Sequence, residues 1–268
     1  MFALARQIFR FRDLLRSLIG RELKARYRGS LLGFFWSLVN PALLLLVYSF
    51  VFGIVFRPCA EAEGTSPYAL FLVTGLFPWI WVSSSLLEGT VALVQNAGLL
   101  RKAVFPAALL PLVAVGSHLV HFLLALPILG AALIGGRLLG HPVGGWPALL
   151  LPLIVLLEIP LVSGLALGLA ALEAHFKDVR DILANLLTLL FFLTPIIYPL
   201  DAVTFKPLWW LVRLNPFTPF TLAYQQALFQ GLWPSLNLWL QMIGCALVGW
   251  AMGAWLFGRL QDTLVEAV

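Results

Sequence analysis

Long apolar stretches recur along most of this chain, separated by short segments that carry charged or helix-breaking residues. A helix needs about 20 apolar residues to cross the hydrocarbon core of a bilayer. Six stretches reach or approach this length, and we expect membrane-spanning helices at 31–56, 67–93, 107–134, 148–172, 182–200 and 236–257. The pattern therefore predicts an all-α, polytopic membrane protein with six transmembrane helices.

A seventh apolar region, 207–230, has a different pattern. It carries Arg213 and Asn215 and is broken by three helix-breaking prolines, Pro207, Pro216 and Pro219. Non-helical backbone at membrane depth survives only where protein or water covers it. We therefore expect a re-entrant region, over about 203–232, before the last span.

The first thirty residues predict an amphipathic helix. Its apolar residues recur at helical spacing: Ile8, Phe11, Leu15, Leu18 and Ile19. Polar residues occupy the other positions: Arg6, Arg10, Asp13, Ser17 and Lys24. Arg12 and Glu22 fall on or near the apolar face. We expect residues 1–30 to lie in the membrane interface on the cytoplasmic side, ahead of a transmembrane domain over 31–268. The helix is either a lipid-touching anchor or also a docking surface for a cytoplasmic partner.

The distribution of basic residues gives the orientation. With six spans, thirteen of them share one side: Arg6, Arg10, Arg12, Arg16, Arg21, Lys24, Arg26, Arg28, Arg101, Lys102, Lys177, Arg180 and Arg259. Only four lie on the other side: Arg57, Arg137, Lys206 and Arg213. Basic residues are enriched in cytoplasmic loops, so both termini are predicted to be cytoplasmic.

Composition agrees with a membrane protein. The chain is 61% hydrophobic and 11% charged, whereas soluble domains carry about 25% charged residues. Its basic residues lie in short loops, which indicates topology rather than nucleic-acid binding. The two cysteines, Cys59 and Cys245, form no metal-ligand spacing, and we expect no metal site.

Motifs for hydrolysis are absent from the sequence. It contains no phosphate-binding loop, H-E-x-x-H, C-x-x-C or G-x-S-x-G. We expect no enzymatic activity in this chain, so uphill transport would draw on a partner ATPase or an ion gradient. An ion-coupled carrier needs ionisable groups inside its spans, and His118, His121 and Glu158 are the candidates. They form either a local Glu–His hydrogen-bonded pair that joins two helices or a proton relay.

Five motifs occur in order over nearly the whole chain: RYRGSLLGFFWSLVNPALLLLVYSFVFG at 26–53, NAGLLRKAVFP at 96–106, HFKDV at 175–179, TPIIYPLD at 194–201 and LNPFTPF at 214–220. Together they resemble the membrane subunits of ABC-2-type polysaccharide exporters, which secrete capsule, O-antigen or teichoic-acid chains. Lys177 departs from the pattern, because the family more often has arginine there and lysine lacks its bidentate geometry.

The resemblance implies a homodimer in the inner membrane of a bacterium, with two copies of a separate ATPase subunit that bind ATP and Mg²⁺. This chain would then bind no cofactor itself. The residues implied in coupling to the ATPase are Glu22, Arg26, Leu99, Arg101, Lys102 and Phe105. A cytoplasmic loop carries Lys177, Asp178 and Arg180. The alternative for the 94–105 segment is a plain positively charged loop.

The resemblance also implies that the first and fifth spans line a conduit, and each contains a proline, Pro41 or Pro195. Aromatic faces suit a sliding sugar chain. The implied conduit residues are Phe35, Trp36, Asn40, Tyr48, Phe191, Phe192, Tyr198, Trp209 and Trp210. The alternative is that these side chains face lipid or pack the bundle.

Four functions follow from these observations. We expect an ATP-driven exporter of a lipid-linked or otherwise anionic polysaccharide. An exporter of a smaller lipid or drug shares the same fold. An ion-coupled carrier and a nonenzymatic membrane scaffold belong to other classes. An ATPase encoded by a neighbouring gene would favour export.

Overall fold

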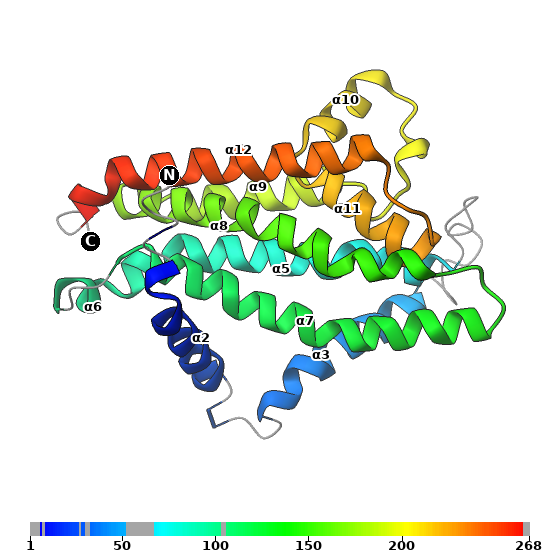
Figure 1. Ribbon diagram of the computed structural model, residues 1–268, viewed down its shortest axis with the longest axis horizontal. Helices are drawn as coiled ribbons and strands as arrows, with labels where there is room; N and C mark the ends of the chain where they lie inside the picture. Colours follow the sequence, from blue (N-terminus) through cyan, green and yellow to red (C-terminus); the bar gives the residue numbers. More distant parts are fainter. Residues whose placement is uncertain are drawn as a thin grey trace.

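The computed structural model of the protein describes residues 6, 9–26, 28–29, 33–51, 67–102 and 106–264. Within these ranges the regular structure is helical and contains no strand, which confirms the all-α prediction for this part of the chain. Figure 1 shows long helices lying side by side along one axis. The helices are α2 (Arg12–Arg26), α3 (Trp36–Phe50), α5 (Tyr68–Gln95), α6 (Ala97–Lys102), α7 (Leu109–Leu138), α8 (Leu151–His175), α9 (Val179–Leu193), α10 (Lys206–Leu214), α11 (Thr218–Tyr224) and α12 (Leu236–Leu260).

Four helical stretches are long and apolar enough to cross a membrane: Tyr68–Gln95, Leu109–Leu138, Trp146–His175 and Leu236–Leu260. They coincide with four of the six predicted spans. The last of these stretches, α12, is capped by the preceding residue Ser235, whose hydroxyl accepts a hydrogen bond from the amide of Leu238 at 3.3 Å.

The other two predicted spans contain shorter helices. α3 and α9 have 15 residues each. Residues 31–32 and 52–56 of the predicted first span lie outside the described residues. The prediction that the helix of the fifth span continues to residue 200 is wrong, because this helix ends at Leu193. Thr194 precedes Pro195, and a residue before proline is pushed out of the α region. The six-span count stays a prediction.

α5 is the central helix of the bundle. It packs against α3, α7, α8, α9 and α11, and its buried residues lie on every side of it. An apolar pattern all round a helix is typical of one that other helices enclose. Its largest buried side chains include Phe71 and Trp81, which are 1% and 2% exposed. α5 therefore sets the positions of the helices around it.

α8 and α12 pack along most of their lengths through glycines. Gly164 and Gly168 on α8 face Gly249 and Gly253 on α12, with the same four-residue spacing on both helices. A Cβ atom at Gly253 would collide with the backbone of Gly164. Small residues at this spacing let two helical backbones approach closely, which strengthens packing where water is absent.

The proline-rich region after α9 folds into short segments. α10 and α11 are followed by a π-helix, Gln225–Gln230, which ends at Gly231 with a φ of 67°. The predicted break of this region into separate pieces is therefore observed. Its re-entrant placement in a membrane stays a prediction.

Polar side chains hold this region onto the preceding turn. The amide of Asn215 donates to the hydroxyl of Thr194 at 2.7 Å, and the amide of Gln225 donates to the carbonyl of Pro195 at 2.7 Å. The hydroxyl of Tyr68 donates to the carbonyl of Ile197 at 2.6 Å. The last two bonds give non-helical backbone carbonyls partners within the protein, as burial in an apolar surrounding requires.

The amphipathic helix α2 packs against α7. Its predicted apolar residues Phe11, Leu15, Leu18 and Ile19 are half-buried, and Ile19 lies against Gly116. Ile8 lies outside the described residues. Contact with α7 agrees with the predicted apolar face, while a position in the membrane interface stays a prediction.

The close approach of α8 and α12 predicts that a single added methyl group at their contact lowers the stability of the protein. We expect Gly253→Ala to lower stability by about 1–3 kcal/mol, the usual cost of overpacking. Gly244→Ala, on the same helix with nothing within 4 Å of the new Cβ, should be neutral or slightly stabilising, because alanine favours helix over glycine. Thermal unfolding of the purified protein in detergent measures both. Equal stability of the two variants would contradict the glycine-mediated packing.

Candidate functional site

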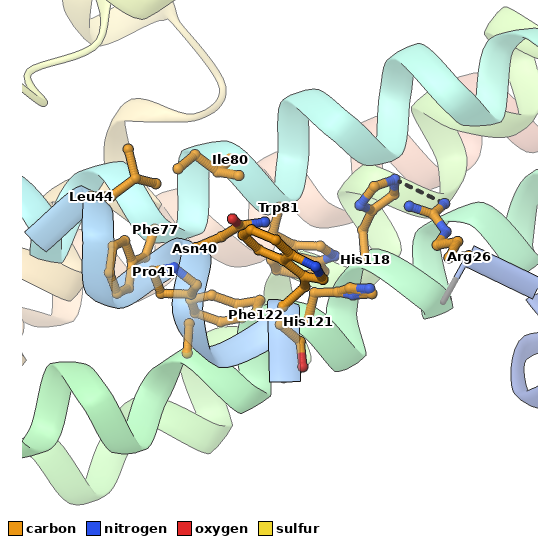
Figure 2. A pocket seen from close by; sticks show the side chains of 13 residues that line it. Arg26, Asn40, Pro41, Leu44, Phe77, Ile80, Trp81, His118, His121 and Phe122 are labelled. Carbon is orange, nitrogen blue, oxygen red and sulfur yellow. Dashed lines mark hydrogen bonds between the residues drawn. The ribbon is translucent and has the colours of Figure 1, made fainter. Parts of the chain in front are cut away.

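A cleft of about 390 Å³ lies between α3, α5 and α7, with Arg26 of α2 at one end (Figure 2). The first span contributes one wall, and the central helix and α7 contribute the others. The lining residues are Arg26, Trp36, Ser37, Asn40, Pro41, Leu44, Phe77, Ile80, Trp81, His118, His121, Phe122 and Ala125. The cleft therefore brings together residues from four helices that are far apart in the sequence.

The wall contributed by α3 carries the polar Asn40 beside Pro41. Pro41 lies inside the helix and supplies no amide hydrogen to the carbonyl of Ser37, one turn earlier. Trp36 is 37% exposed and opens toward the cleft. This wall thus offers an aromatic face and an amide side by side, while the predicted conduit role of Trp36 and Asn40 stays a prediction.

The opposite wall is a rigid aromatic stack. The rings of Trp81 and Phe122 stack with centroids 5.5 Å apart and planes at 9°, and the indole N–H of Trp81 points to the carbonyl of Val115 at 3.4 Å. Phe122 in turn meets the ring of Tyr224 edge-on at 6.2 Å. Packed rings of this kind have few alternative rotamers, so the wall keeps its shape.

A charged network closes one end of the cleft. The guanidinium of Arg26 binds a carboxylate oxygen of Glu88 on α5. The other oxygen of Glu88 lies 2.7 Å from Nε2 of His118 on α7. Arg26 also pairs with Glu22 one turn earlier on α2, with Nε and Oε1 3.5 Å apart. The network joins the N-terminal helix to two helices of the bundle.

The network pairs opposite charges. Arg26 faces two carboxylates, Glu22 and Glu88, and its side chain is 26% exposed. A partly buried charge needs such partners, because unpaired burial costs several kcal/mol. The arrangement explains why Glu22 and Arg26 lie toward the packed side of an otherwise basic helix. Among the described residues no group of three histidine, cysteine or acidic side chains could hold a metal ion.

The predicted pairing of Glu158 with the two histidines is wrong. The carboxylate of Glu158 accepts a hydrogen bond from the hydroxyl of Tyr224 at 2.7 Å, and both side chains are buried. His118 and His121 meet edge-on with ring centroids 6.1 Å apart, and His118 bonds to Glu88. The histidines and Glu158 therefore form two separate sites, because other helices supply each of them with a nearer partner.

Glu88, the residue that joins the charged network, was not among the predicted site residues. A signal for it was present, because Glu88 is a carboxylate within the predicted span 67–93, and acidic residues inside spans are rare. Glu173 was also missed. Its carboxylate accepts a hydrogen bond from the amide of Arg180 at 2.8 Å and so caps the start of α9. No local sequence pattern predicted the hydrogen bond between Glu173 and the amide of Arg180.

The predicted coupling residues occupy two places. Glu22 and Arg26 bind within the chain, in the charged network. Leu99, Arg101 and Lys102 belong to α6, the short helix between α5 and α7; Phe105 lies outside the described residues. In the predicted cytoplasmic loop, Lys177, Asp178 and Arg180 are all exposed at the connection between α8 and α9. Their roles toward a partner stay predictions.

The predicted conduit residues fall into three groups. Trp36 and Asn40 line the cleft, Phe35 precedes them with 66% exposure, and Tyr48 is half-buried on the core. A second group lies at the end of α9. Phe191 packs against Trp79 with centroids 6.2 Å apart, Phe192 is exposed, and the Tyr198 hydroxyl donates to the carbonyl of Phe192 at 3.0 Å.

The third group lies on α10, where the rings of Trp209 and Trp210 meet at 5.1 Å and the guanidinium of Arg213 covers Trp209 at 4.1 Å. Because α3 and α9 both pack on α5, the first two groups lie on helices beside the central helix, while the third lies on α10, which packs on α11. One chain by itself does not bring them into a single surface.

Comparison with known proteins defines the class of this fold and site. The sequence profile of the ABC-2 type transporter family matches residues 13–229. The chain belongs to this family and is a multi-pass membrane protein. It is 38% identical over 234 residues to an O-antigen export system permease protein, RfbA, of Myxococcus xanthus, covering 86% of this chain and 85% of that one. It is 31% identical over 219 residues to RfbA of Klebsiella pneumoniae, covering 82% and 81%.

The charged network predicts a measurable coupling between α2 and α5. We expect a double-mutant cycle of Arg26→Ala and Glu88→Ala to give an interaction energy of roughly 0.5–3 kcal/mol, because the two side chains share one ion pair. The measurement is thermal unfolding of the wild type, both single variants and the double variant in detergent.

Arg16 supplies the matched control for this cycle, because it lies on the same helix and pairs with Asp13 at 3.8 Å. Arg16→Ala combined with Glu88→Ala should give additive effects. Additivity in the Arg26 cycle as well would show that the ion pair does not hold α2 on the bundle.

Proposed function

We propose that the protein is the membrane-spanning subunit of an ATP-driven exporter that moves a polysaccharide, linked to a lipid carrier, across the cytoplasmic membrane. The observation that carries this proposal is the similarity, over more than four fifths of both chains, to permeases of O-antigen export systems. The all-helical bundle with its exposed aromatic and amide side chains supports it.

The proposed topology has six spans with both termini in the cytoplasm. Its support is the separation of basic residues: α6, the 176–178 connection and the end of α12 lie at one end of the bundle, while the 139–145 connection and α10 lie at the other (Figure 1). The first end carries Arg101, Lys102, Lys177 and Arg259. Basic residues mark the cytoplasmic side.

Energy would come from a separate ATPase, bound in two copies beneath a homodimer of this chain. The chain carries no phosphate-binding loop, and its family moves substrates with ATP hydrolysed elsewhere. α6 is the element proposed for coupling, because it joins α5 to α7 at the basic end and places Arg101 and Lys102 on a short helix. Movement of α6 would act on the central helix directly.

The proposed path uses the faces of α3 and α9 that the single chain leaves open. α9 exposes Asp181, Asn185 and Thr188 along one side, at helical spacing, together with the ring of Phe192. Polar side chains toward lipid are unfavourable, so this side of α9 is better suited to a hydrated path or to a second copy of the chain. A path with mixed rings and amides suits a sugar polymer.

The proposed function predicts that export needs the partner ATPase and ATP. We expect the purified permease in liposomes to transport nothing by itself, and the permease with its ATPase to export polysaccharide when ATP is added. Dissipating the proton gradient should leave the rate unchanged. The measurement is protected glycan inside inverted vesicles. Export by the permease alone on imposing a pH gradient would instead identify an ion-coupled carrier.

The cleft predicts a role for the ring of Trp36. We expect Trp36→Ala to slow export several-fold at matched membrane levels, because the stacked face is lost, whereas Trp36→Phe should keep most of the rate. Trp255→Ala is the matched control, since that tryptophan is 60% exposed on α12 and does not line the cleft. The readout is export per assembled complex. Normal export by Trp36→Ala would place this ring outside the path.

A further inference from the structure

A second pocket, of about 280 Å³, lies at the end of the bundle opposite α6, among α10, α11, the π-helix and the start of α12 (Figure 1). It is separate from the cleft at Trp36 and shares no lining residue with it. We call it the amide pocket. Its polar lining residues are Asp201, Arg213, Thr218, Gln225, Gln226, Gln230, Ser235, Asn237 and Gln241.

The composition of this pocket is unusual for so apolar a chain. Four of the seven glutamines in the sequence line it, together with an asparagine. A side-chain amide both donates and accepts hydrogen bonds, and sugar hydroxyls do the same. Several amides around one small space can therefore bind a sugar ring by its hydroxyl groups. A lipid tail would leave these amides without hydrogen-bond partners, which is unfavourable.

The pocket is built on fixed backbone. Gln225, which is 2% exposed, donates to the carbonyl of Pro195, and the Thr218 hydroxyl donates to the carbonyl of Val212 at 2.6 Å. Three of the four glutamines belong to the π-helix, Gln225–Gln230. π-Helices are rare overall, and those that occur are often found at functional sites, because they cost stability and change the direction of side chains. The buried residues anchor the wall while Gln230, Asn237 and Gln241 stay exposed at the opening.

The charges of the pocket favour an uncharged ligand. Asp201 and Arg213 oppose each other in sign, and the guanidinium of Arg213 is stacked on Trp209. A phosphate site would instead gather several basic groups. The volume lies at the small end of ligand sites, roughly 300–1,000 Å³, which suits one sugar residue or a short piece of a polymer.

We infer that the amide pocket is a saccharide-binding site that holds a neutral sugar residue of the exported polymer at the end of the bundle opposite α6. The inference rests on the proposed function, because it takes the polymer to be the substrate. It adds a second, hydrogen-bonding contact for the polymer, distinct in chemistry from the aromatic cleft.

Photo-crosslinking in cells that make the polymer tests this contact. A photoreactive amino acid at Gln241 should yield permease joined to glycan, detected by glycan staining of the purified protein after irradiation. The same residue at Leu247, 58% exposed on the same helix and outside the pocket, should yield none. A third position, Trp36, reports on the proposed path itself.

Crosslinking at the three positions distinguishes the amide pocket from the proposed function on which it rests. Glycan joined at Trp36 but not at Gln241 would overturn the amide pocket and leave the proposed function standing. Glycan at none of them would count against polysaccharide export altogether. Joining at Gln241 and Leu247 alike would show contact without a site, and would also overturn the inference.

A pair of substitutions tests the hydrogen bonds. Gln226→Met with Gln241→Met keeps side-chain length but removes both amides, and we expect export per complex to fall about three- to tenfold, the range for one or two net hydrogen bonds. ATP hydrolysis and complex assembly should be unchanged. Gln261→Met, outside the pocket, is the control. Unchanged export per complex in the double variant would overturn the inference.

Discussion

Backbone amide and carbonyl groups that lie in hydrocarbon must find partners within the protein, and this constraint governs the least regular part of the structure. Between α9 and α12 the chain is broken by prolines, yet Asn215, Gln225 and Tyr68 donate to the hydroxyl or carbonyl groups of the turn after Leu193. The irregular backbone is therefore tolerated because it is packed against the bundle. One of these residues, Gln225, also lines the amide pocket.

The remaining helices satisfy the same constraint by themselves and need only to pack. The helices pack in two ways. α5 is apolar on every side and is enclosed by its neighbours, whereas α8 and α12 approach through glycines so closely that a single added methyl at Gly253 meets backbone. Without water to drive association, close van der Waals contact of this kind is a main source of stability. The bundle in turn holds the cleft walls in place.

The charged network gives the N-terminal helix a fixed relation to the cleft. Arg26 belongs to the same network as Glu88 of the central helix and lines the cleft that contains Trp36 and Asn40. Basic residues at this end also mark the side proposed for the ATPase. In the proposed coupling, few steps separate the partner from the cleft: α6 follows α5 in the chain, and α5 carries both Glu88 and Trp81 of the aromatic wall.

The sequence by itself determined which segments are helical and apolar, because hydropathy over about 20 residues reflects a local requirement. It also placed the proline breaks, since proline acts on its own turn. Only the tertiary structure decided the partners of ionisable groups. Arg26 and Glu88 are 62 residues apart, and Glu158 binds Tyr224, 66 residues away. Such pairs depend on how the helices are rotated and stacked against one another. The packing of the whole bundle determines this arrangement, and no single segment of the sequence encodes it.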